Sequence, residues 1–304
     1  MKIKIRHLIK ITGEKGVIII KDVSDDIISI FSVLVQSNFF YNDLKKLKAS
    51  DSQEAVVIGN GPSLKDTLKE HLNFFSGKTN ICVNDFALSE YFSAIKPDFY
   101  IPFDSAYWKK DVSQSLRINN EKIFKLLKDK VSWPMTIIMP LSAREWSWFT
   151  GLERFNKNIK ICYVNWTRID CSNLLKNFLY SKNLAMPRCA NVLINALFLA
   201  INMGYKKIFL AGADHSWHEG IFVGEDNVVY RKGEYCYSEG KTSLESAFKD
   251  LEGTQVYKLH ELFHLISLTF QGHQEIEEYA RFAGAKVYNI SKKSYIDAYE
   301  RLSL

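Results

Sequence analysis

The sequence feature that most constrains the fold is a short apolar run that ends in a glycine turn. Residues 55–58 read Ala-Val-Val-Ile, and Gly59-Asn60-Gly61-Pro62-Ser63 follows, ahead of polar, helix-forming sequence from 64 to 75. An apolar run of this length bounded by glycine is typical of a buried strand, and proline suits the first turn of a helix. The sequence therefore predicts a strand, a tight turn and a helix in direct succession.

Apolar runs of the same kind recur along the chain. The sequence predicts further strands over residues 80–84, 98–102, 131–140, 159–164, 208–212 and 285–289. Helices are expected over 190–203 and 257–283, with Gly272 breaking the second, and over 295–302. Strands that alternate with helices predict an α/β fold with a Rossmann-like, mostly parallel sheet and helices on both faces.

Two segments stand apart from this alternation. We expect residues 1–50 to form a basic N-terminal appendage, with a short strand over 16–21 and an apolar helix over 27–39. We expect residues 51–304 to form a single α/β domain. Within it, residues 215–256 contain five glycines and no apolar period, which predicts a long, lid-like loop.

Composition excludes several classes of protein. The 304 residues are 47% hydrophobic and 24% charged, with a net charge of +6, as in ordinary globular proteins. Five scattered cysteines without a CxxC pair argue against a zinc site or a disulfide framework. We see no nucleic-acid-binding signature, no signal peptide and no apolar run of the ~18 residues that span a bilayer. We therefore expect a cytoplasmic protein with no nucleic-acid partner.

The excess of positive charge lies mainly near the N-terminus. Apolar residues alternate there with the basic residues Lys2, Lys4, Arg6, Lys10, Lys15 and Lys21. Such a segment can lie on the anionic surface of an inner membrane, which would make the protein peripheral to it. An ordinary basic terminus explains the same residues, and the sequence leaves both interpretations open.

Polar residues follow the first three predicted strands of the domain. Glycine at 59 and 61 permits close approach of the backbone to a ligand, and N–H groups at a helix N-terminus favour phosphate. Asn84 and Asp104 follow the second and third strands, and ligands of parallel sheets bind beyond the carboxyl ends of the strands. The alternatives are a tight turn without a ligand and Asn84 as a helix cap.

A fourth predicted strand ends in Gly212-Ala-Asp214-His-Ser-Trp-His218. Asp214 and the two histidines supply groups that bind ligands or transfer protons. The loop beyond holds tyrosines whose hydroxyls can bind a phosphate without a metal: Tyr230, Tyr235 and Tyr237. A tyrosine-rich loop that merely faces solvent is the alternative.

His260 and His264 lie four residues apart in the predicted long helix and meet the HExxH pattern of zinc proteases. A protease of that kind needs a third ligand downstream, and His273, nine residues on, does not fit the spacing. We therefore expect no metal site and interpret one of the pair as a general base. The alternative is that these histidines have no chemical role and merely pack against other residues or face solvent.

Four of these motifs together resemble a known family. They are the turn over 58–64, Asn84, the segment Gly204-Tyr-Lys-Lys-Ile-Phe-Leu-Ala-Gly-Ala-Asp214, and Lys286-Val-Tyr-Asn289. In this order, over roughly residues 55–290, they resemble bacterial sialyltransferases of the Campylobacter lipooligosaccharide type. The turn is also similar to a wider superfamily that includes hydroxymethylpterin diphosphokinase-like domains and flagellin-glycosylation proteins.

The resemblance implies a glycosyltransferase of bacterial surface polysaccharide or lipopolysaccharide biosynthesis. It would transfer a nonulosonic acid, sialic-acid-like or Kdo-like, from a CMP-activated donor to a glycan acceptor, with inversion and without a metal or any other cofactor. The resemblance places His260 first and His264 second as the base. It assigns donor binding to Gly59, Asn60, Gly61, Ser63, Asn84, Asp104, Arg188, Asp214 and one or more of Tyr230, Tyr235 and Tyr237.

Two positions depart from the family pattern. Asp104 stands where the family has an asparagine, and no Thr-Ser pair follows Arg188. The alternative enzyme is a Mg²⁺-dependent 6-hydroxymethylpterin diphosphokinase, which needs carboxylates near the phosphates, and Asp85, Asp104 and Asp214 are the candidates. A non-enzymatic nucleotide-sugar-binding protein is a third reading. Whether the chain forms a homo-oligomer stays open.

Overall fold

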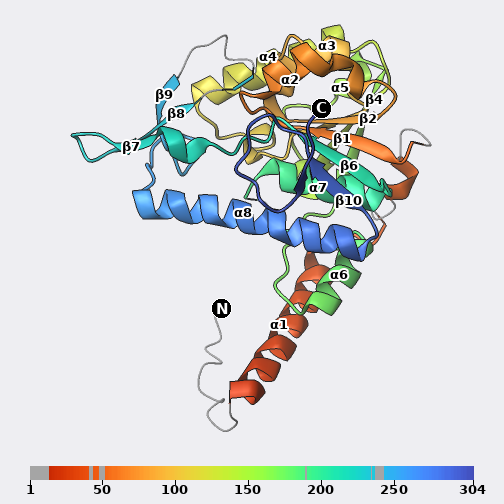
Figure 1. The fold of residues 1–304 in the computed structure, drawn as a ribbon, viewed down its shortest axis with the longest axis vertical. Coiled ribbons are helices and arrows are strands. Elements are labelled where there is room, and N and C mark those ends of the chain that lie inside the picture. Colours follow the sequence, from red (N-terminus) through yellow and green to blue (C-terminus); the bar gives the residue numbers. More distant parts are fainter. Residues whose placement is uncertain (1–13, 41–43, 48–51, 189, 234, 237–242) are drawn as a thin grey trace.

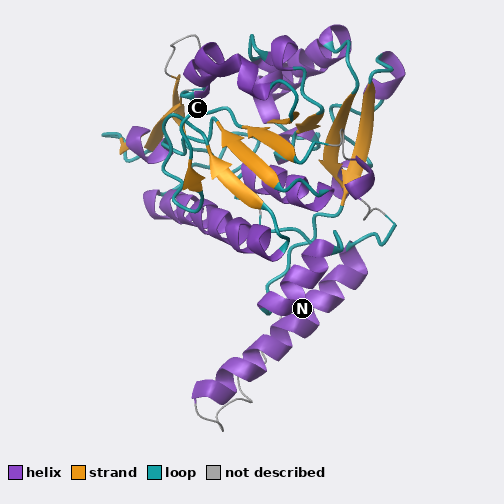
Figure 2. Ribbon diagram, turned by 45° about the vertical axis from the view of Figure 1, so that its right-hand side comes forward, coloured by secondary structure: helices purple, strands orange, loops and turns teal. Residues whose placement is uncertain are grey.

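The structure, a computed structural model, describes residues 14–40, 44–47, 52–188, 190–233, 235–236 and 243–304. Its centre is an eight-stranded sheet in the order β11-β10-β6-β1-β2-β3-β4-β5 (Figures 1 and 2). All neighbouring strands in it are parallel. The strands are β1 (Glu54–Ile58), β2 (Thr79–Val83), β3 (Phe99–Ile101), β4 (Met135–Pro140), β5 (Ile159–Val164), β6 (Lys207–Ala211), β10 (Lys286–Asn289) and β11 (Glu300–Arg301). The predicted α/β fold is confirmed.

The central strands are apolar throughout because helices cover both faces of the sheet. In β1, Ala55, Val56, Val57 and Ile58 are all fully buried, as expected for parallel strands that face the core on both sides. The helices are α1 (Glu14–Gln36), α2 (Leu64–His71), α3 (Phe92–Ile95), α4 (Gln114–Lys130), α5 (Leu152–Phe155), α6 (Asn173–Ser181), α7 (Val192–Met203) and α8 (Leu259–Phe282). Short 3₁₀ turns span Leu44–Leu47, Leu72–Phe75, Asn84–Leu88, Ser105–Tyr107, Leu141–Ala143 and Trp217–Gly220.

The path of the chain through the sheet reverses at β1. From β1 the strands progress outward through β2, β3, β4 and β5, and then α7 carries the chain back to β6 on the other side of β1. The strands β10 and β11 continue from there. In open α/β sheets, ligands bind beyond the carboxyl ends of the strands at such a reversal, so the loops after β1 and β6 are the first place to look for a site.

The predicted long helix is confirmed as α8, but Gly272 does not break it. Gly272 is buried, and a Cβ atom there would lie 2.4 Å from Cδ1 of Ile194 in α7. The glycine thus lets two helices approach closely. The predicted terminal helix over 295–302 is wrong: residues 300–301 form β11, which pairs with β10.

The described residues of the segment 215–256 include regular strands, where the sequence predicted a loop. The segment contains a small antiparallel sheet of β7 (Ile221–Val223), β8 (Val229–Gly233) and β9 (Ser243–Ser246), which lies near the first turns of α8 in Figure 1. Strands of three to five residues are too short to show an apolar period. The turn between β7 and β8 has Asn227 in the left-handed region, at φ 59°.

The N-terminal region projects from the body of the molecule as α1, beside α6 (Figures 1 and 2). The predicted helix over 27–39 is largely confirmed, but the strand expected over 16–21 is wrong, since those residues are helical. A helix satisfies its backbone hydrogen bonds within itself, whereas an isolated strand has no partner. The division of the chain at residue 50 stays a prediction.

Candidate active site at the carboxyl edge of the sheet

The glycine turn after β1 is packed against the end of β6. The N–H of Gly59 donates to the carbonyl of Ala211 at 2.8 Å, and that of Gly61 to Gly212 at 2.9 Å. A Cβ atom on Gly61 would lie 2.1 Å from Oδ1 of Asp214, and one on Gly59 would lie 2.4 Å from the Gly212 carbonyl oxygen. Only glycine fits at both positions, because two strand ends meet there.

Asp214 binds the start of α2. Its Oδ2 accepts from the N–H of Ser63 at 3.0 Å, and its Oδ1 accepts from the Ser63 hydroxyl at 2.8 Å. Burial raises the pKa of Asp214, and the two bonds from Ser63 oppose that rise. A carboxylate of the protein therefore already serves the helix N-terminus, so we interpret Ser63 and Asp214 as groups that shape the turn.

Two asparagines lie at the ends of neighbouring strands with unused acceptors. Asn60 donates from Nδ2 to the carbonyl of Val83 at 3.1 Å, which links the ends of β1 and β2. Asn84 adopts φ 44°, and its carbonyl accepts from the Tyr100 hydroxyl. The Oδ1 atoms of Asn60 and Asn84 are buried and have no hydrogen-bond partner among the described residues. Buried polar atoms are normally paired, so these two acceptors at adjacent strand ends are candidates for contact with a ligand.

Asp104 continues this row at the end of β3. Its Oδ1 accepts from the Ala106 N–H at 2.9 Å and so caps a 3₁₀ turn. Its side chain is exposed, yet desolvation by the surrounding protein raises the pKa of its carboxyl. The charge of Asp85 adds to that rise, and the charge of Arg231 in β8 lowers the pKa. The carboxyl of Asp104 therefore interacts electrostatically with Arg231 of the small sheet.

The two predicted base candidates lie on the first turns of α8. His260 and His264 are both exposed. Next to His260, Glu261 accepts from Nζ of Lys249 at 2.6 Å and from the Lys258 N–H at 2.8 Å. These contacts attach the first turn of α8 to the segment that holds Lys249, which lines the pocket described below.

The histidines that the structure brings together are a different pair. His215 follows β6, and its Nε2 lies 2.8 Å from Nε2 of His273 in α8. The Nδ1 of His273 lies 2.9 Å from the Tyr299 hydroxyl. Burial is the main cause that lowers the pKa of both, to about 3 for His273. Both imidazoles are therefore neutral near pH 7. The sequence does carry a signal for the burial of His273, because this residue shares the buried side of α8 with Thr269 and Ile276.

The three predicted tyrosines have different surroundings. Tyr230 donates to Oδ2 of Asp226 at 2.8 Å and stacks on Phe222, so it belongs to the β7–β8 hairpin. Tyr235 is exposed, and the next residue, Cys236, donates its N–H to the carbonyl of Asn60 at 3.1 Å. Tyr237 lies outside the described residues. Of Tyr230 and Tyr235, it is therefore Tyr235 whose neighbour in the sequence contacts the glycine turn.

Arg188 precedes α7, and its side chain is exposed. Its carbonyl oxygen lies 3.8 Å from where a Cβ atom of Gly272 would be, so its backbone lies close to the middle of α8. The first turn of α7 is capped by Asn191, whose Oδ1 accepts from the Leu193 N–H at 2.9 Å.

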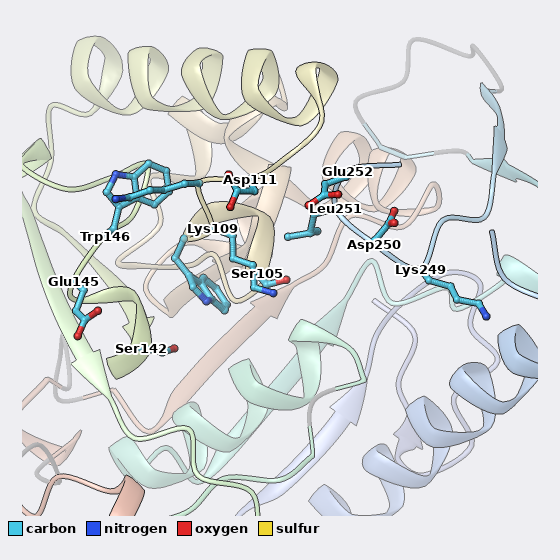
Figure 3. A pocket seen from close by; sticks show the side chains of 12 residues that line it. Ser105, Lys109, Asp111, Ser142, Glu145, Trp146, Lys249, Asp250, Leu251 and Glu252 are labelled. Atoms are coloured by element: carbon cyan, nitrogen blue, oxygen red, sulfur yellow. The ribbon is translucent and has the colours of Figure 1, made fainter. Parts of the chain in front are cut away.

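A pocket of about 680 Å³ opens beyond the ends of β3 and β4 (Figure 3). Its wall begins at Ser105, the residue after Asp104, and includes two indole rings, Trp108 and Trp146. The other lining residues are Lys109, Lys110, Asp111, Ser142, Glu145, Lys249, Asp250, Leu251 and Glu252. Three segments far apart in the sequence build this pocket, so no local motif of the sequence indicates it.

The carboxylates considered for Mg²⁺ are engaged separately. Asp85 accepts from the Tyr107 hydroxyl at 2.7 Å and from Nδ2 of Asn119 at 2.9 Å, and Asp214 accepts from Ser63. In the part of the chain that the structure describes, no three His, Cys, Asp or Glu residues are grouped to hold a metal ion. Nor is any helix in that part long and apolar enough to span a bilayer.

Comparisons with known proteins give structural likenesses but no match to a family or a curated protein. No protein-family model matches the chain, and no curated protein matches it significantly. A solved structure, the MAf glycosyltransferase from Magnetospirillum magneticum AMB-1, is similar with a TM-score of 0.47 and 12% sequence identity. The match covers 87% of this chain and 38% of that chain, so this chain spans less than half of the length of that protein.

Proposed function

We propose that this chain is a glycosyltransferase that moves a nonulosonic acid, sialic-acid-like or Kdo-like, from a CMP-activated donor to a glycan acceptor. The observation that carries the proposal is the pair of buried, unpaired Oδ1 atoms of Asn60 and Asn84. They lie beside the strand reversal, where nucleotides bind in sheets of this kind. The amino group of cytosine and the hydroxyls of ribose are donors of the kind these acceptors lack.

The groups around this row suit the rest of the donor. A nonulosonic acid carries a carboxylate, and a guanidinium binds a carboxylate through two parallel hydrogen bonds. Arg231 is close enough to Asp104 to lower the pKa of that carboxyl, so we assign it to the donor carboxylate. Tyr235 and Arg188 are our assignments for the phosphate, because they flank the turn at Asn60 and the start of α7 respectively.

The pocket next to Asp104 suits the acceptor. Its volume of about 680 Å³ falls within the range of about 300–1,000 Å³ usual for small-ligand sites. Trp108 and Trp146 present flat apolar surface to the C–H face of a sugar ring, and Asp111, Glu145 and Glu252 present acceptors for its hydroxyls. An acceptor glycan bound here would lie next to the proposed donor site of Asn60, Asn84 and Asp104, at the end of β3.

The chemistry then needs one proton acceptor. The acceptor hydroxyl attacks the anomeric carbon from the face opposite the phosphate, so a new C–O bond forms while the bond to the CMP phosphate breaks. The electron pair leaves with the phosphate, and the hydroxyl proton passes to a base. We assign that base to His260, with His264 as second choice, because the first turn of α8 is attached to the pocket wall at Lys249.

Calorimetric titration with CMP tests the donor site. Asn60→Ala and Asn84→Ala should each weaken CMP binding about 5- to 30-fold, the loss of a net hydrogen bond to a buried group, about 1–2 kcal/mol. Asn73→Ala, at an exposed asparagine, is the matched control and should leave the affinity unchanged. Absence of CMP binding by the unmodified chain would overturn the proposal.

A further inference from the structure

The exposed side of the first turns of α8 carries two histidines. His260 and His264 are four residues apart on the helix, and both side chains are exposed. Side chains at this spacing lie one above the other, with their Cβ atoms about 5–6 Å apart. Neither imidazole makes a hydrogen bond or a ring contact with a residue that the structure describes. Both rings can therefore turn toward a common point above the helix.

A pair of imidazoles on one side of a helix is a chelator for transition metals. Imidazole nitrogen suits Zn²⁺, Cu²⁺ and Ni²⁺, whereas Mg²⁺ and Ca²⁺ prefer oxygen ligands. Zinc binds histidine nitrogen at about 2.0–2.1 Å, so two nitrogens on one tetrahedral ion are roughly 3.3 Å apart. Rotation of two histidine side chains from neighbouring turns can bring their nitrogens to that separation.

The surroundings of the pair decide what kind of metal site it is. Glu261 lies between the two histidines in the sequence, but it is held by Nζ of Lys249 at 2.6 Å and by the Lys258 N–H at 2.8 Å. No third His, Cys, Asp or Glu joins a metal-holding group in the described part of the chain. Two protein ligands leave the other positions of the ion to water, unlike the closed four-ligand site of structural zinc. Binding here is therefore reversible.

The pair also contains the residue that we assign as the proton acceptor of the transfer. A general base takes a proton with the lone pair of a neutral imidazole nitrogen, and a metal ion binds that same lone pair. An ion held by both histidines therefore blocks whichever of them accepts the proton.

We propose that His260 and His264 bind a divalent ion of the zinc, copper and nickel class, and that the bound ion inhibits the transfer. The metal site follows from the two histidines alone, whereas its inhibitory effect rests on the function proposed above. The proposal agrees with a metal-independent reaction, because the ion stops the chemistry and does not assist it.

Calorimetric titration of the metal-stripped full chain with ZnCl₂ tests the site. The unmodified chain should bind Zn²⁺, and MgCl₂ should give no heat of binding. His260→Ala and His264→Ala should each weaken Zn²⁺ binding at least about tenfold, because one of the two protein ligands is lost. His71→Ala on α2, at a side chain 38% exposed, is the matched control and should bind Zn²⁺ as the unmodified chain does. Thermal melting without metal identifies a variant that has merely lost its fold.

A transfer assay tests the inhibition. Zn²⁺ should lower the rate of the unmodified chain, EDTA should restore it, and Mg²⁺ should have no effect. The proposal fails if the unmodified chain binds no Zn²⁺, if both single variants bind it equally well, or if saturating Zn²⁺ leaves the transfer rate unchanged. A chain that binds Zn²⁺ through this pair but transfers no sugar would support the metal site and overturn the proposed function.

Discussion

The most unusual contact between two side chains is that of His215 with His273. Both rings are buried, and their Nε2 atoms lie 2.8 Å apart, so one ring must donate its proton to the other. His215 adopts φ 51° and stacks on Trp217 with the ring centres 4.4 Å apart. The pair fastens the middle of α8 to the end of β6 next to Asp214. It therefore holds the loop after β6, which carries Asp214, against α8.

This pair makes stability depend on pH. Burial lowers the pKa of His273 from 6.5 to about 3 in the folded chain and lowers that of His215 as well. The unfolded chain therefore binds more protons below pH 6.5, so folding is most stable above that pH and loses stability as the pH falls. Each histidine should contribute up to about 1.4 kcal/mol per pH unit. Urea unfolding from pH 7 to pH 5 measures this slope.

The variant His273→Gln separates this pair from other titrating groups. It keeps a hydrogen-bonding side chain but removes one ionisable ring, so the slope below pH 6.5 should fall by about one proton. The change His71→Asn, outside the buried pair, is the control and should leave the slope as it is. Identical slopes in the unmodified chain and His273→Gln would show that this pair does not set the pH dependence.

At the scale of elements, the packing of α8 on α7 depends on a residue that a helix normally disfavours. Glycine in a helix costs about 0.5–1 kcal/mol relative to alanine. Gly272 is nevertheless required, because a Cβ atom there would lie 2.4 Å from Cδ1 of Ile194. The close approach of the two helices decides the residue here, and local helix propensity is overruled.

A double-mutant cycle tests this contact. Gly272→Ala should destabilise the chain by about 1–2 kcal/mol, since overpacking outweighs the gain in helix propensity. Ile194→Val removes the atom that clashes, so Gly272→Ala in that background should be neutral or stabilising by up to about 1 kcal/mol. Denaturant unfolding of the four proteins gives the coupling energy. Additive changes would contradict the proposed contact.

At the scale of the whole molecule, the polar residues that end β1, β2 and β3 and the pocket share one edge of the sheet. Asn60, Asn84 and Asp104 follow the adjacent strands β1, β2 and β3, and the pocket begins at Ser105 and extends beyond β4. The small β7–β9 sheet brings Arg231 toward Asp104. The proposed donor and acceptor would therefore lie side by side where the parallel strands end.

This arrangement makes a prediction about metal ions. The proposed transfer uses amide, tyrosine and arginine groups to bind the donor, so EDTA should leave CMP affinity and transfer within about twofold of their untreated values. The kinase alternative would lose its activity, because phosphate transfer there depends on Mg²⁺. CMP titration and a transfer assay before and after EDTA, with Mg²⁺ added back as the control, distinguish the two. Loss of CMP binding on chelation would refute metal independence.

The parts of the structure that the sequence predicted depend on neighbours in the chain. The apolar run before Gly59 and the glycine turn after it are local signals. The strands from β1 to β6 and the helices α7 and α8 carry signals of the same kind, and the sequence predicts them close to their observed places. The small sheet was missed because its strands are short. The strand over 16–21 was wrong because β-branched residues signal a strand only where a partner strand exists.

The sequence by itself determined the parallel α/β fold and the polar residues at the ends of its strands, because strand ends and turns are written in contiguous residues. Only the tertiary structure decided what those residues touch. Asp214 binds Ser63 across 151 residues, and His215 meets His273 across 58. The pocket likewise needs three distant segments. Contacts of this range depend on how whole elements pack, and no local pattern of residues encodes that.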